Sequence, residues 1–117
     1  MEVIKRPNNA QEIEVEGATV PFYKYKLGED TIIEFDTSRC GPPEPMVNAM
    51  AGLKLIKDEH TKLLMINHKK PMGLLQKIGE NFEIEEAKMD DGRVQLLFSY
   101  KKGASEKANL DDASCSG

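Results

Sequence analysis

The sequence predicts an α/β fold of the α+β type, a two-layer sandwich. We expect a mixed four-stranded sheet in the order βαβαββ with two helices on one face. Apolar residues recur at every second position before Pro43, as in a strand, and at every third or fourth position after it, as in a helix. A continuous apolar run, TKLLMINH, separates two segments of helical spacing and is typical of a central strand. Asp91-Gly92, between two alternating segments, predicts a closing β-hairpin.

An N-terminal β-hairpin is expected to precede this unit. Residues 1–10 have the polar composition of a loose lead-in. In the following EIEVEGATVPFYKYKL, Ile13 and Val15 share a face and Gly17 provides the turn. TIIEFDTS, residues 31–38, then predicts the first strand of the sandwich. Helices on one side only leave an open sheet face, so the hairpin is expected either to extend an edge or to shield that face.

The first helix is expected to begin close to Pro43 and Pro45, since the first turn needs no intrahelical N–H donors. Gly52 weakens it slightly. Its apolar face follows the spacing i, i+3, i+4 and i+7: Met46, Ala49, Met50 and Leu53.

The second helix is expected to follow in KKPMGLLQKIGENF, with Pro71 in its first turn and Gly79 at its end. Asn67 or His68 is expected to supply its cap. In the last strand, one face is predicted to hold three apolar residues: Val94, Leu96 and Phe98.

The chain is divided into three parts. Residues 1–30 are the lead-in and hairpin, 31–102 the sandwich domain, and 103–117 a disordered tail rich in small and polar residues. A length of 117 residues fits one small core.

Composition excludes several classes of function. The net charge is −4 and the pI about 5.2, and no basic stripe is present, so nucleic acid is not the expected partner. Neither a secretory h-region nor an apolar run of about 20 residues is present, so we expect no membrane contact and a cytoplasmic location.

We also expect no cofactor and no metal. His60 and His68 lie eight residues apart, about 26 Å along a strand that rises roughly 3.3 Å per residue. At this distance the two histidines cannot bind one metal ion together. Cys40 and Cys115 are interpreted as free thiols, since one of them lies in the tail.

Two stretches could carry chemistry. Cys40 precedes a helix, whose dipole can lower the pKa of a thiol, and Arg39 would act in the same sense. The alternative is a small buried apolar residue. His68, Lys69 and Lys70 stand before the second helix, where an anion could bind.

The residues DTSRCGPPEPM, followed by a second strand–helix unit and a hairpin, resemble the TusA/SirA-like sulfur-carrier superfamily over residues 31–101. The resemblance implies a two-layer βαβαββ sandwich. In that family an Asp ends the first strand and Cys-Pro-x-Pro opens the first helix. Its cysteine carries sulfur as a persulfide and passes it between proteins in tRNA thiolation or related sulfur trafficking.

By this resemblance, Asp36 takes the place of the strand-end Asp, and Pro43, Glu44 and Pro45 take that of Pro-x-Pro. Pro42 then stands at the position of the carrier cysteine, where it cannot do the chemistry. The chain is most similar to an uncharacterised branch of the superfamily that has this proline. NHKKPMGLL also resembles the loop of that branch, which carries over His68.

Two hypotheses follow. In the first, the chain is a non-catalytic module linked to sulfur or redox metabolism, and the proline-rich start of its first helix forms a pocket for another protein or a small anionic ligand. In the second, it is a sulfur carrier that uses the displaced thiol Cys40. Pro42 favours the first, so we lean against an enzyme. An exposed edge strand in the hairpin would be a natural homodimer contact.

Overall fold

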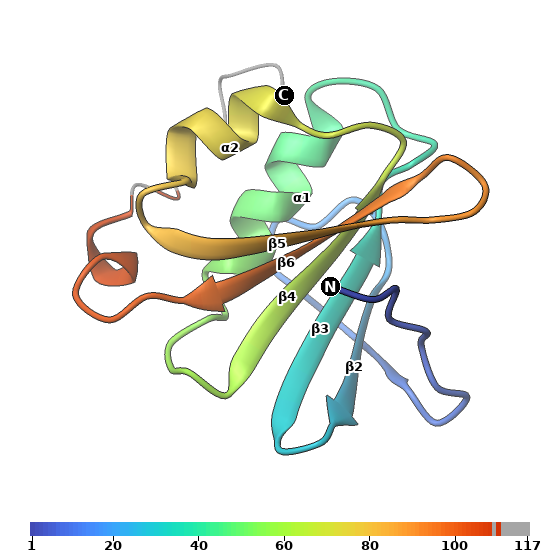
Figure 1. Ribbon diagram of the computed structural model, residues 1–117, viewed down its shortest axis with the longest axis horizontal. Helices are drawn as coiled ribbons and strands as arrows, with labels where there is room; N and C mark the ends of the chain where they lie inside the picture. Colours follow the sequence, from blue (N-terminus) through green and yellow to red (C-terminus); the bar gives the residue numbers. More distant parts are fainter. Residues whose placement is uncertain (109, 111–117) are drawn as a thin grey trace.

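Figure 1 shows the computed structural model, which describes residues 1–108 and 110. The strands are β1 Gln11–Ile13, β2 Phe22–Leu27, β3 Asp30–Asp36, β4 Thr61–Asn67, β5 Phe82–Lys88 and β6 Val94–Tyr100. The helices are α1 Glu44–Leu53 and α2 Met72–Ile78, and a short 3-10 helix, η1, spans Ser105–Lys107. The α+β class is confirmed, and the order from β3 onward is βαβαββ, as predicted.

The strands form one mixed six-stranded sheet in the order β1-β2-β3-β4-β6-β5. The prediction of a four-stranded sheet was therefore wrong. The reason is that β2 pairs antiparallel with β3 along its whole length, from Phe22↔Phe35 to Leu27↔Asp30. The turn between them uses Gly28 at φ +64°, a conformation that glycine adopts without strain. Among the paired strands of the described residues, only β3 and β4 run parallel.

The larger apolar core lies between the two helices and one face of the sheet (Figure 1). The rings of Phe22 and Phe35 stack there with centroids 4.8 Å apart. The helices contribute Leu74, Ile78 and all four residues predicted for the first apolar face: Met46, Ala49, Met50 and Leu53. Among the described residues, no helix combines the length and apolarity that crossing a membrane requires.

The predicted cap of the second helix was wrong. Pro71 stands at the N-cap position, and within the described part of the chain no side chain caps this end of the helix. Asn67 is buried and used elsewhere: its Oδ1 accepts from Thr37 Oγ1 at 3.0 Å, and its Nδ2 donates to the Lys69 carbonyl at 2.9 Å. His68 is exposed.

Residues 1–10, here called the strap, lie against the sheet face opposite the helices (Figure 1). Ile4 and Ala10 pack there on a second apolar cluster formed by Tyr25, Ile32, Leu64 and Leu97. The expected loose lead-in therefore has a fixed place. Both expected roles of the N-terminal region occur, because the hairpin extends the sheet while the strap shields part of its open face.

The predicted disordered tail, 103–117, begins too early. Ser105 is buried within η1. Its Oγ donates to the Asn81 carbonyl at 2.6 Å and accepts from the Lys101 N–H at 2.7 Å. The rest of that prediction, for residues 109 and 111–117 with Cys115, lies outside the described residues.

Gly52 is required where α1 packs on the sheet. A methyl group at Gly52 would lie 2.6 Å from Leu63 Cδ1 and 3.1 Å from Phe22 Cε2. Both side chains are fully buried, and protein interiors are close-packed, so a shift of either one is expected to be costly. We expect Gly52→Ala to lower the free energy of unfolding by about 1–3 kcal/mol, despite a helix-propensity gain of up to about 1 kcal/mol. Urea unfolding measures this effect.

Gly41→Ala is the matched control, because a methyl group there would meet nothing within 4 Å. Equal or greater stability of Gly52→Ala than of the wild type would contradict the close packing.

Candidate functional site

The parallel pairing of β3 and β4 brings three segments together at one edge of the sheet. The loops after both strands leave from the same end, where the Thr37 N–H donates to the Ile66 carbonyl at 2.8 Å. The turn between β5 and β6 reaches the same edge, because Val94 pairs with Asn67. The segment from Asp36 to Pro45 therefore lies beside the loop that holds His68 and beside the hairpin turn.

Arg93 connects two carboxylates at this edge. Its Nη1 donates to Asp36 Oδ2 at 2.9 Å, and its Nε donates to Asp91 Oδ2 at 2.8 Å. The other Asp36 oxygen accepts from the Ser38 N–H at 2.8 Å. The Arg93 backbone N–H and then its guanidinium hold the pKa of Asp91 below its usual range. The predicted site residue Asp36 is thus fixed by Arg93, which the sequence reasoning missed.

The proline-rich start of α1 offers few donors to an anion. The Glu44 N–H donates to the Gly41 carbonyl at 3.1 Å, and Pro45 has no N–H. Pro43 occupies the N-cap position, and its peptide bond with Pro42 is cis. Glu44 also places its own negative charge in the first turn, where it interacts favourably with the helix dipole. The predicted anion pocket at this helix start therefore lacks support.

The surroundings of Cys40 disfavour its thiolate form. A hydrogen bond to the Glu44 carboxylate, followed by burial and by the charges of Glu44 and Asp36, raises the pKa of Cys40 to about 11. This is opposite to the direction expected from the helix dipole and Arg39, which is exposed. The thiol form therefore dominates at neutral pH, and the nucleophilic thiolate is scarce.

The raised pKa of Cys40 can be measured directly. In a Cys115→Ser background, we expect the rate of alkylation by iodoacetamide to rise with pH around a midpoint near the pKa of about 11. Glu44→Gln removes the carboxylate and should move this midpoint down towards the ordinary thiol value of about 8.5. A wild-type midpoint at or below that ordinary value would contradict the assigned hydrogen bond.

The predicted basic cluster lies at the surface, and one of its lysines pairs with a carboxylate. His68, Lys69 and Lys70 are all exposed, and Lys70 Nζ lies 3.4 Å from Glu86 Oε1. Within residues 1–108 and 110, no three His, Cys, Asp or Glu side chains are grouped as a metal ion would require.

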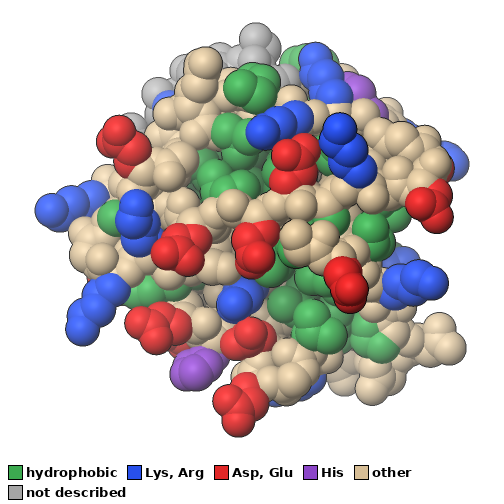
Figure 2. Space-filling model, viewed as in Figure 1, with side chains coloured by type: hydrophobic (Ala, Val, Ile, Leu, Met, Phe, Trp, Pro, Cys, Tyr) green, Lys and Arg blue, Asp and Glu red, His purple; other side chains and the backbone are tan. Residues whose placement is uncertain are grey.

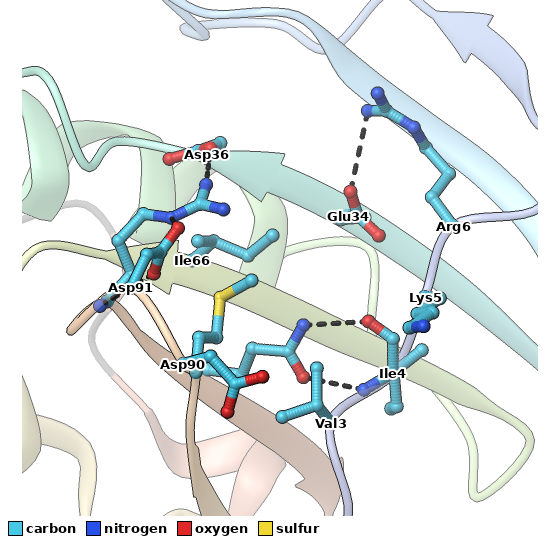
Figure 3. A pocket seen from close by; sticks show the side chains of 12 residues that line it. Val3, Ile4, Lys5, Arg6, Glu34, Asp36, Ile66, Asp90 and Asp91 are labelled. Atoms are coloured by element: carbon cyan, nitrogen blue, oxygen red, sulfur yellow. Dashed lines mark hydrogen bonds and ion pairs between the residues drawn. The ribbon is translucent and has the colours of Figure 1, made fainter.

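The sheet face opposite the helices carries two buried polar side chains, Glu34 and Gln95, which are 4% and 1% exposed. Gln95 Nε2 donates to the Ile4 carbonyl at 2.8 Å, and the Ile4 N–H donates to Gln95 Oε1 at 2.8 Å (Figure 3). Glu34 accepts from the Tyr25 hydroxyl at 2.8 Å and from Arg6 Nη1 at 3.4 Å. Both buried groups therefore bind the strap.

Burial controls the ionisation of this pair. Burial raises the pKa of Glu34, while the Tyr25 hydrogen bond and the charge of Arg6 partly oppose the rise. The pKa of Tyr25 is raised by burial and by its hydrogen bond to Glu34. A carboxylate in this position gains from any additional cation that reaches it.

A hollow of about 530 Å³ lies between the strap and the end of this sheet face. We call it the strap hollow. Its walls are strap residues 3–6, the β5–β6 turn and side chains of the sheet: Glu34, Asp36, Ile66, Arg93 and Gln95. Acidic and basic side chains are both spread across this side of the molecule, with apolar side chains visible between them (Figure 2). Of the residues predicted for a site, Asp36 is in this hollow, whereas His68 is not among its lining residues.

The sequence did contain a signal for Glu34 and Gln95. Each is a polar residue within an apolar strand, in TIIEFD and VQLLF, at a position that alternation assigns to the face opposite the helices. Such positions are normally solvated, so only the strap that covers them makes them notable. Arg93 follows a tight turn, and no sequence pattern distinguishes it from an ordinary surface residue.

Comparisons with protein-family models, curated proteins and solved structures gave no match to this chain.

Glu34 should make the stability of the chain depend on pH. Its pKa is raised above the ordinary value of 4.5, so between the two values the folded chain holds a proton that the unfolded chain has released. The free energy of unfolding then falls as the pH rises through this window. We expect the wild type to lose stability relative to Glu34→Gln from pH 4.5 towards neutral pH, measured by urea unfolding.

Glu83→Gln, at an exposed position on β5, is the matched control. A stability difference between the wild type and Glu34→Gln that does not change with pH would be the contrary result.

Proposed function

We propose that this protein is a non-catalytic module that binds another protein through the sheet face opposite its helices. The observation that carries the proposal is the pair Glu34 and Gln95, buried polar side chains on a face that neither α1 nor α2 covers. Burying a polar group costs free energy unless the group is hydrogen-bonded. Polar residues in a strand that is otherwise apolar therefore tend to occur at functional positions. Both already bind an extended piece of chain, residues 4–6 of the strap.

Charge favours a basic protein segment over the small anion that was the other expected partner. The sheet and the hairpin turn contribute four carboxylates to the strap hollow, Glu34, Asp36, Asp90 and Asp91, against the single guanidinium of Arg93. Two of these carboxylates pair with that guanidinium.

Two residues support the non-catalytic part of the proposal: Pro42, at the position of the carrier cysteine, and Cys40, two residues before it. Pro42 has no thiol, and the thiol of Cys40 has a pKa raised to about 11 by its carboxylate neighbour. A link to sulfur trafficking rests on the resemblance of residues 31–101 to TusA-like carriers.

Sulfur loading tests the proposal against the carrier alternative. The full chain is incubated with a cysteine desulfurase and free cysteine, and intact mass spectrometry follows any gain of sulfur. We expect no gain at Cys40 in a Cys115→Ser background, because the protonated thiol is a poor acceptor. Pro42→Cys places a thiol at the position of the family's carrier cysteine. This variant is the matched control in which a gain of sulfur is expected.

A stable gain of one sulfur by the Cys115→Ser chain, absent when Cys40→Ser is added, would overturn the proposed function in favour of a carrier.

A further inference from the structure

We propose that this sheet face is a groove for an extended peptide with the pattern apolar residue, any residue, arginine, and that residues 4–6 of the strap occupy it as a competitor within the chain. The inference rests on the proposed function and names the chemistry of the partner segment. Three contacts in sequence along the strap carry it.

The first contact recognises a backbone. In an extended chain the N–H and C=O of one residue point to the same side, as they do in an antiparallel pair. A side-chain amide offers one donor group and one acceptor, so it can bind both. Gln95 does this with Ile4, at 2.8 Å in each direction. Its 1% exposure means that both hydrogen bonds are made away from water, where an unpaired amide would be costly.

The second contact recognises an apolar side chain. Ile4 is half-buried against the apolar cluster on this face: Tyr25, Ile32, Leu64 and Leu97. These four residues lie on the side of the sheet opposite α1 and α2. Burial of an aliphatic side chain here contributes binding free energy in proportion to the apolar area that is removed from water.

The third contact recognises a planar cation two residues further on. The Arg6 guanidinium carbon lies 3.8 Å above the centroid of the Tyr23 ring, and Nη1 lies 3.4 Å from Glu34 Oε2. Arginine suits this position better than lysine, because its flat group can stack on a ring and still hydrogen-bond a carboxylate. Lys5, between the two anchors, is exposed, so its identity is free.

The strap is held in a way that allows exchange. Among the described residues, its one backbone–backbone hydrogen bond outside regular strands is internal, from the Ala10 N–H to the Pro7 carbonyl at 3.2 Å. It adds no ladder to the sheet, and the Arg6 side chain stays 42% exposed. A tethered segment competes at an effective concentration of about millimolar order, so a partner segment with better contacts can displace it.

The test uses the full chain with its own strap disabled. In the variant Ile4→Asp/Arg6→Glu, both side-chain anchors of the strap are lost while the residues of the sheet face are unchanged. The probe is a fluorescein-labelled peptide with the wild-type sequence of residues 1–9, MEVIKRPNN, followed by fluorescence anisotropy. We expect saturable binding to the variant and at least about tenfold weaker binding to the wild type, whose strap competes.

Two controls assign the contacts. Adding Gln95→Leu to the variant, at similar side-chain size, should weaken peptide binding at least about tenfold, since two buried hydrogen bonds are lost. A double-mutant cycle pairs Glu34→Gln in the protein with an Arg6→Gln peptide. The two losses should be smaller together than their sum. Circular dichroism and thermal melting verify folding, and Arg6→Gln alone provides a milder variant of the strap.

Three results would overturn the inference. One is the absence of peptide binding to the folded variant. Another is equal binding of a scrambled peptide, which would leave only general charge attraction. The third is a wild-type dimer that becomes monomeric in Ile4→Asp/Arg6→Glu, which would make the strap of a second copy the occupant. Each is separate from the sulfur-loading result at Cys40, which alone decides against the proposed function.

Discussion

The parallel pairing of β3 with β4 is the constraint on which the rest of the molecule depends. Because the two strands point the same way, the chain must cross over between them, and α1 makes that crossing on one face of the sheet. The crossing buries the larger core on one face, and the opposite face is covered by neither α1 nor α2. The same pairing sends the loops after both strands to one edge, where Asp36 meets Arg93. Fold and candidate site thus have one origin.

The two faces of the sheet are stabilised by different means. The helix side is apolar and tightly packed, and Gly52 shows how little space remains there. The other side has a smaller apolar cluster and two buried polar groups, Glu34 and Gln95, that need partners. The strap meets this need with a backbone and a guanidinium. Stability of the fold and occupancy of that face are therefore coupled.

The sequence predicted what depends on local period and turn chemistry. It indicated the apolar face of α1, the Asp91-Gly92 turn and the order of elements from β3 onward. It left open whether the N-terminal hairpin would extend the sheet or shield its open face, since the pairing of β2 depends on its partner strand and not on either strand alone. The positions of Gln95 and Glu34 could be read from alternation, but their burial depends on a distant segment. The effect of Glu44 on Cys40 is likewise a tertiary contact.

Attachment through one amide side chain also fixes the alignment of the strap. A shift by one residue would turn the backbone groups of the new residue away from Gln95, because successive residues of an extended chain face opposite ways. A shift by two would bring either Glu2 or Arg6 to the apolar cluster where Ile4 now packs. Gln95, a single residue of β6, therefore sets the register of an extended chain that crosses this face, and it disfavours every register that places a charged residue on the apolar cluster.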